Sequence, residues 1–213
     1  MSDLVRPRVG VLALHGGVAE HEAALADVGA ETRRVRSAAD LDDLDGLVIP
    51  GGETTTIHRV ARSLELGPAL RAAVRGGLPT LGTCAGLIAL AREVRDGPEA
   101  LVGGLDIAVR RNAYGRQRAS FEALVQAPSL GREELPGVFI RAPRVEEVGP
   151  AAEVLATCGG EVVAVRQGSV WGTAFHPELT ADRRLHAAFV AVVRAGGAAE
   201  VEPRRGGAFR VGA

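Results

Sequence analysis

Three times in its first half, the chain places a short apolar segment before a glycine-containing loop, and a segment with helical periodicity follows. The apolar segments end at Leu14, Ile49 and Leu81, and each is continuous rather than alternating with polar residues. Continuous apolar strands that alternate with helices are typical of a parallel sheet covered on both faces. This repetition predicts an α/β fold.

Each of these units also carries helix signals. After the first apolar segment, Val18, Leu25 and Val28 share one helical face. After the second, the threonines that follow Gly51 and Gly52 are expected to cap a helix. After the third, we expect a helix through residue 94, because apolar residues share a face at positions 87, 90, 91 and 94.

The second half of the chain reads as shorter strands separated by turn signals. These strands are expected at 105–109, 120–126, 137–141, 153–157, 161–167 and 170–175. A helix from about Asp182 to Arg194 closes the fold. The sequence therefore predicts a single-domain open, mostly parallel sheet flanked by helices, with additional antiparallel strands in the second half.

Length and charge limit the domain count and the partners. A chain of 213 residues suits one domain, which we place at 1–195, with a disordered tail at 196–213 because that stretch lacks periodicity. The net charge of −1 disfavours nucleic acid and anionic membranes as partners. The sequence shows no signal-peptide pattern and no apolar stretch near the roughly 18 residues of a membrane span, so a cytoplasmic protein with two free thiols is expected.

Cys84 stands between two glycines, in Gly82-Thr83-Cys84-Ala85-Gly86, where an apolar strand gives way to a helix. This is the spacing of a nucleophile elbow, a strained turn that presents a nucleophile above a sheet. A helix N-terminus also favours the reactive thiolate. The alternative is a buried packing residue, which is the commoner role of a free cysteine.

Two further features favour the reactive interpretation. His176 and Glu178 follow a predicted strand, and alternate strand positions would let Glu178 orient the imidazole. The backbone amides of Gly52 and Ala85 could form an oxyanion hole. Taken singly, a loop histidine and a turn glycine would need no function, but together with Cys84 they complete a Cys/His/Glu set.

These motifs resemble a known family. The segments GVLAL, PGGETTTI, GTCAGLIALA, RRNAYGRQRASFE, GVFIRAP and FHPELT occur in order between Gly10 and Phe189. Together they resemble the glutaminase subunit of pyridoxal 5′-phosphate synthase, within the triad class of glutamine amidotransferases. The resemblance implies hydrolysis of L-glutamine to glutamate and ammonia, with the ammonia passed to a separate synthase subunit that builds vitamin B6.

The resemblance also implies residue roles. Cys84 is the nucleophile, and His176 and Glu178 are its partners. The glutamine site is implied to consist of Gly52, Glu53, Thr54, Arg111, Ile140 and Arg141. The family usually has serine where this chain has Thr54. An arginine suits a substrate α-carboxylate, but the sequence offers four arginines between 110 and 118, and only the resemblance selects Arg111.

Other functions fit less well. A DJ-1-like or intracellular-peptidase-like cysteine hydrolase uses a similar elbow but tends to carry its histidine directly after the cysteine, where this chain has Ala85. A non-catalytic regulatory subunit would not need Cys84, His176 and Glu178 intact. The sequence has no dinucleotide-binding glycine pattern and no cluster with metal-ligand spacing, so no cofactor or metal is expected.

The remaining histidines and the second cysteine receive no role. His21, His58 and His186 are expected to be surface or structural residues, as is Cys158. His15 is a departure from the family, which usually has glutamine after the first strand. It is either a tolerated loop residue or part of the coupling between the oxyanion hole and the partner subunit.

Overall fold

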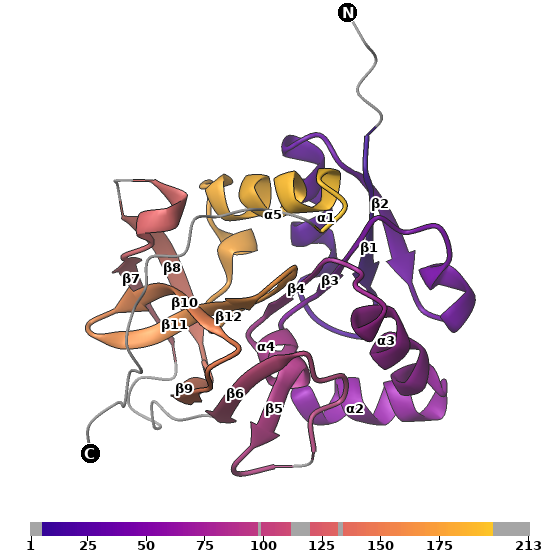
Figure 1. The fold of residues 1–213 in the computed structure, drawn as a ribbon, viewed down its shortest axis with the longest axis horizontal. Helices are drawn as coiled ribbons and strands as arrows, with labels where there is room; N and C mark the ends of the chain where they lie inside the picture. Colours follow the sequence, from indigo (N-terminus) through magenta and orange to yellow (C-terminus); the bar gives the residue numbers. More distant parts are fainter. Residues whose placement is uncertain (1–5, 98, 112–119, 132–133, 198–213) are drawn as a thin grey trace, which may run out of the picture.

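The computed structural model describes residues 6–97, 99–111, 120–131 and 134–197. The strands of its main sheet are β1 (Arg8–Leu12), β2 (Glu31–Val35), β3 (Gly46–Ile49), β4 (Thr80–Thr83), β10 (Glu153–Cys158), β11 (Glu161–Gln167) and β12 (Val170–Thr173). These seven strands lie in the order β10-β11-β12-β4-β3-β1-β2 (Figure 1). Neighbouring strands from β12 to β2 are parallel, whereas β10 and β11 pair antiparallel, as the sequence predicts.

Helices cover both faces of this sheet. They are α1 (Val18–Asp27), α2 (Thr54–Ser63), α3 (Leu66–Arg75), α4 (Ala85–Leu90) and α5 (Arg184–Arg194). Figure 1 shows α1 and α5 on one face and α2, α3 and α4 on the other. No helix in the described part of the chain is long and apolar enough to cross a membrane. The tail expected at 196–213 lies outside the described residues from 198 onwards.

Two smaller sheets supply the additional strands. One contains β5 (Ala91–Val94), β6 (Leu105–Arg110) and β9 (Arg144–Val148), with β6 between the other two. The other pairs β7 (Ser120–Val125) with β8 (Leu135–Ile140) in antiparallel register. The last residue of β8, Ile140, lies beside Cys84.

The structure corrects the expected third helix. It ends at Leu90, and the following residues form strand β5, where Ala91 pairs with Leu105. All six residues of α4 are buried, so no exposed helical face marks where the helix stops. Strand β9 and helix α3 were not anticipated either. The expected threonine cap is also wrong, because the carboxylate of Glu53 caps α2.

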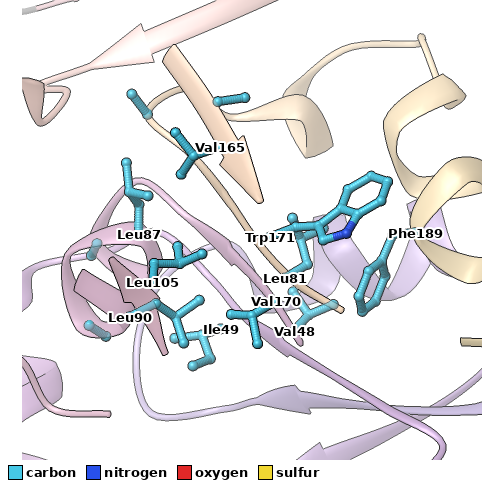
Figure 2. Close-up of a cluster of buried hydrophobic side chains, with 14 of the residues drawn as sticks. Val48, Ile49, Leu81, Leu87, Leu90, Leu105, Val165, Val170, Trp171 and Phe189 are labelled. Atoms are coloured by element: carbon cyan, nitrogen blue, oxygen red, sulfur yellow. The ribbon is translucent and has the colours of Figure 1, made fainter. Parts of the chain in front are cut away.

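Aliphatic side chains fill the core, as expected for a chain with 3% aromatic residues. Figure 2 shows Val48, Leu81 and Val170 of the central strands among these side chains. Trp171 and Phe189 meet edge to face, with ring centroids 6.4 Å apart, and join β12 to α5. Burying each large side chain of this kind contributes about 1.5–3 kcal/mol, which holds the central strands in register.

This register determines which loops meet at the end of the sheet. Thr173 of β12 lies opposite Thr83 of β4, and Ile49 of β3 lies opposite Gly82. Because neighbouring parallel strands end at the same edge, the loops that follow β1, β3, β4 and β12 converge there. Candidate residues from all four loops therefore lie within one region.

Candidate active site

Cys84 occupies a strained turn between β4 and α4. Its backbone has φ 49° and ψ −101°, a combination that costs a residue with a side chain roughly 1–3 kcal/mol. Its N–H donates to the Thr173 carbonyl at 2.8 Å. A Cβ at Gly86 would overlap the Ile49 carbonyl, so a glycine is required where the helix leaves the turn. The local geometry is that of the predicted elbow.

His176 and Glu178 meet as the sequence predicts, although not for the expected reason. Nδ1 of His176 donates to Oε1 of Glu178 at 2.7 Å. However, β12 ends at Thr173, and Glu178 lies in the 3-10 turn Pro177–Leu179. The two side chains are brought together by this turn, and not by alternating strand positions.

The electrostatics of this group favour charge separation. Burial opposes charge on His176, but its interactions with Cys84 and Glu178 outweigh burial and raise its pKa to about 10. Burial likewise opposes the charge of Glu178, but His176 and His21 together lower the pKa of that carboxyl. The imidazole is therefore poised to hold a proton between a sulfur and a carboxylate.

Gly51 lies between the nucleophile and the histidine. A Cβ at this position would collide with Cε1 of His176 and lie 3.2 Å from Cβ of Cys84. The N–H of Gly51 donates to Thr83 Oγ1 at 3.0 Å, and its carbonyl accepts from Gly17 at 3.4 Å. The loop is thus held on both sides, and a glycine is required for His176 to approach.

The two proposed oxyanion donors remain available. Within the described chain, neither the Gly52 N–H nor the Ala85 N–H has a hydrogen-bond acceptor. Gly52 follows the loop residue beside His176, and Ala85 is the first residue of α4 after the nucleophile. Unpaired amides from two different loops are what a developing oxyanion needs.

The end of β8 covers the nucleophile. Sγ of Cys84 lies 3.7 Å from the Ile140 carbonyl oxygen, and the His176 N–H donates to the Val138 carbonyl at 2.8 Å. Arg141 follows with φ 45°, a strained left-handed conformation. The structure therefore brings the Ile140 carbonyl to the thiol, with Arg141 next in the chain, and leaves Cys84 only 7% exposed.

Glu53 and Thr54 lie at the start of α2. The carboxylate of Glu53 accepts from the Thr56 hydroxyl and from the N–H groups of Thr55 and Thr56, and these bonds lower its pKa to about 2. Its own N–H donates to Nδ1 of His15 at 3.2 Å. The Glu53 side chain is therefore engaged in capping, while its backbone lies between the glycine loop and His15.

Arg111 lies apart from the Cys/His/Glu set. Its N–H donates to Oδ1 of Asp96 at 2.7 Å, and Nη2 donates to the Asp96 carbonyl at 2.9 Å. No contact joins it to Cys84, His176 or Glu178 in the described part of the chain. Residues 112–119, which hold most of the segment RRNAYGRQRASFE, lie outside the described residues.

Two histidines without an assigned role reach this site from the other side. His21 and His186 are both fully buried, and Nε2 of His21 lies 3.3 Å from Oε2 of Glu178. The sequence holds a signal for His21, because it falls on the same helical stripe as Val18 and Leu25. If every such histidine is assumed to be structural, this signal is overlooked.

The chain is similar to known proteins along most of its length. A model of the SNO glutamine amidotransferase family matches residues 11–195. The chain is 55% identical over 192 residues to the pyridoxal 5′-phosphate synthase subunit PdxT of Streptomyces avermitilis, covering 89% of this chain and 95% of that protein. It is 54% identical over 203 residues to the protein of that name from Streptomyces coelicolor, covering 94% of this chain and 99% of that protein.

Solved structures agree with this match. A crystal structure of a glutamine amidotransferase superposes with a TM-score of 0.82 at 46% identity, covering 87% of this chain and 98% of that chain. The structure of PurLQS from Thermotoga maritima contains a chain that superposes with a TM-score of 0.67 at 17% identity, covering 90% of this chain and 97% of that chain. At that lower identity the likeness shows a shared fold alone.

Proposed function

This chain belongs to the SNO glutamine amidotransferase family, and from that premise we propose that it is the glutaminase subunit of a pyridoxal 5′-phosphate synthase. It hydrolyses L-glutamine to L-glutamate and ammonia, and the ammonia serves the partner synthase subunit in vitamin B6 biosynthesis. The observation that supports this most strongly is the strained turn at Cys84 beside a His176–Glu178 pair whose Nδ1–Oε1 distance is 2.7 Å.

The reaction proceeds through a thioester. The Cys84 thiolate attacks the carboxamide carbon of glutamine, and the oxyanion that forms is stabilised by the N–H groups of Gly52 and Ala85. His176 gives its proton to the nitrogen as the C–N bond breaks and ammonia leaves. Water then attacks the thioester while His176 takes up its proton, and breakage of the C–S bond releases glutamate and restores the thiolate.

The family resemblance assigns the substrate-binding residues, and the structure supports them to different degrees. Gly52, Ile140 and Arg141 are proposed to position the carboxamide, which is supported by the Ile140 carbonyl oxygen 3.7 Å from Sγ of Cys84. Arg111 is proposed to bind the α-carboxylate, because a guanidinium can hold a carboxylate through two hydrogen bonds. Thr54 and the backbone of Glu53 complete the site at the start of α2.

We assign this activity to residues 1–195. The family model ends at residue 195 and α5 ends at Arg194, which supports this boundary. The cytoplasm is the proposed compartment, because Cys84 and Cys158 are both free and a catalytic thiol needs reducing surroundings. A DJ-1-like hydrolase is disfavoured, since the histidine at Cys84 comes from the distant loop after β12.

The direct test is ammonia release from L-glutamine by the purified chain, with and without a pyridoxal 5′-phosphate synthase partner subunit. We expect ammonia and glutamate in equal amounts, with a higher rate when the partner is present. L-asparagine, which is one methylene shorter, serves as the control substrate and should be hydrolysed far more slowly. Failure to release ammonia from glutamine in both arms would contradict the proposal.

The contact between His15 and Glu53 gives a further prediction. Nδ1 of His15 accepts the Glu53 N–H at 3.2 Å. His15→Ala removes this acceptor, so partner-stimulated hydrolysis should fall, whereas His15→Gln keeps an acceptor in its amide oxygen and should retain most of the rate. The three proteins are to be compared with the same partner and at the same pH. A His15→Ala rate equal to that of the wild type would return His15 to an ordinary loop role.

A further inference from the structure

His21 of α1 has both ring nitrogens engaged in the interior. Its Nδ1 lies 3.1 Å from Nε2 of His186, and its Nε2 lies 3.1 Å from Oγ1 of Thr83. The same Nε2 is 3.3 Å from Oε2 of Glu178, the oxygen that faces away from His176. His21 is fully buried, and an imidazole is costly to bury unless its polar atoms are satisfied. These contacts connect three separate elements behind the nucleophile.

The charge of Glu178 indicates how the protons are arranged. Burial lowers the pKa of His21, and it lowers the pKa of His186 to about 3, so both rings are neutral. A bare lone pair on Nε2 of His21 would face the carboxylate, so we assign the hydrogen to Nε2. Nδ1 of His21 then accepts from His186. Among the described residues, this leaves the buried Nδ1 of His186 as an acceptor without a donor, which is less rare in proteins than an N–H without an acceptor.

Thr83 extends this network to the oxyanion loop. Its hydroxyl oxygen accepts the Gly51 N–H at 3.0 Å as well as the His21 N–H. The His21 N–H is aligned with Thr83 rather than with Glu178, whose Oε2 has no aligned hydrogen bond within the described chain. His21 therefore acts on Glu178 through the positive end of its N–H dipole. It acts on Gly51 through a shared hydroxyl.

The residue before α1 also lies close to this carboxylate. A Cβ at Gly17, the residue before α1, would lie 3.1 Å from Oε1 of Glu178. The backbone N–H of His21 donates to the Gly17 carbonyl at 3.2 Å. Gly17 and His21 thus form one rigid unit against Glu178, because the backbone bond between them belongs to the helix itself.

We propose that His21 is a positioning residue for glutamine hydrolysis, joining the carboxylate of Glu178 and the amide of Gly51 into one buried network. The inference rests on the proposed function, because it concerns the same site. The ring nitrogens of His21 are engaged by His186 and Thr83 and not by the nucleophile. Its loss disturbs the orientation of His176 and of the oxyanion donors, so the turnover step suffers and substrate binding does not.

A pH profile distinguishes this role from simple packing. The groups that face His21 are Glu178, His176 and His186 from other elements, and Glu20 from its own helix. The N–H at Nε2 of His21, whose nitrogen lies 3.3 Å from Oε2 of Glu178, favours the charged form of that carboxyl and so keeps its pKa low. Without His21 that pKa rises, so Glu178 takes up its proton at a higher pH as the solution is acidified. The acid limb of kcat/KM should therefore move to higher pH.

The central test compares His21→Phe and His21→Gln in the full chain with its synthase partner. His21→Phe keeps a ring but removes both nitrogens, and kcat should fall about 10- to 100-fold, the size of loss seen when the hydrogen-bond partner of a metal ligand is removed, while KM stays within about three-fold. His21→Gln can place an amide N–H near the position of Nε2, so it should recover part of kcat. A folded His21→Phe with wild-type kcat and an unshifted acid limb would overturn the proposal.

Leu25→Ala is the matched control. Leu25 lies one turn further along α1 and is equally buried, but it has no polar atom to offer the network residues named above. It should lower Tm yet leave kcat and the acid limb unchanged. An equal loss of kcat in Leu25→Ala would show that only the docking of α1 matters, and would overturn the specific role of His21.

Thr83 provides a second test if His21→Phe does not fold. Thr83→Val keeps the shape but removes the hydroxyl, so the Gly51 N–H loses its acceptor and kcat should fall. Thr83→Ser keeps the hydroxyl and should retain most of kcat. Equal activity in the two variants would overturn the proposal. If the wild-type chain with its partner releases no ammonia at all, the proposed function itself is wrong. If the wild type is active and the variants are equally active, only the role of His21 is wrong.

Discussion

Cys84→Ala is expected to abolish ammonia release from glutamine while the fold persists. The substitution removes the nucleophilic sulfur but little volume, and alanine meets the same backbone demand at φ 49° as cysteine does. Removing a nucleophile that acts as part of a triad lowers kcat by about six orders of magnitude. Ammonia release measures the effect, and circular dichroism with a thermal melt shows whether the fold is retained.

Cys158→Ala is the matched control for this experiment. Cys158 is the other free thiol, at the end of β10, and its replacement should leave turnover unchanged. A glutamine-like electrophile should add its mass to the peptide that contains Cys84 and not to the one that contains Cys158. Residual turnover of Cys84→Ala above about one per cent of wild type would point to another nucleophile.

Glu178→Gln should cause the next largest loss. The carboxylate fixes the tautomer of His176 through the 2.7 Å bond and stabilises the imidazolium. A neutral amide cannot stabilise that charge and favours the wrong tautomer. Loss of the equivalent carboxylate in a hydrolase triad lowers kcat about 10⁴-fold, and we expect a reduction approaching that size. KM should stay within a few-fold because Glu178 is buried behind His176.

Steady-state kinetics with glutamine separate the effect of Glu178→Gln on kcat from its effect on KM. Glu22→Gln removes a partly exposed carboxylate that pairs with Arg34, and this control should leave both kcat and KM at wild-type values. If Glu178→Gln raised KM and left kcat intact, the carboxylate would belong to substrate binding instead of to the orientation of His176.

The parallel sheet could be predicted from the sequence because its strands are buried on both faces. Strand β3, for example, has four buried residues in a row, and such a run directly before a glycine loop is typical of a central parallel strand. The end of α4 could not be predicted, because a fully buried helix and a buried strand carry the same apolar residues. Only the pairing of Ala91 with Leu105 in the tertiary structure distinguishes the two.

The residues of the candidate site also fall into those that the sequence could predict and those that it could not. Cys84 and the pair His176 and Glu178 each lie in a short motif, so local spacing was enough to propose them. His21 and His186 are 165 positions apart, and no local pattern shows that their rings meet. Arg111 is the opposite case. The family motif selects it, but its observed contacts are with Asp96 and not with the triad.

The strained backbone at Cys84 lowers the thermal stability of the fold, but the cysteine at this position is required for turnover. A residue that adopts a positive φ without strain would raise the free energy of unfolding by roughly 1–3 kcal/mol. This is a sizeable part of the roughly 5–15 kcal/mol that typically separates folded from unfolded chains. Selection for heat resistance alone would therefore tend to remove the nucleophile. Efforts to engineer a more robust protein should leave this turn untouched and seek their gains at surface positions far from the converging loops.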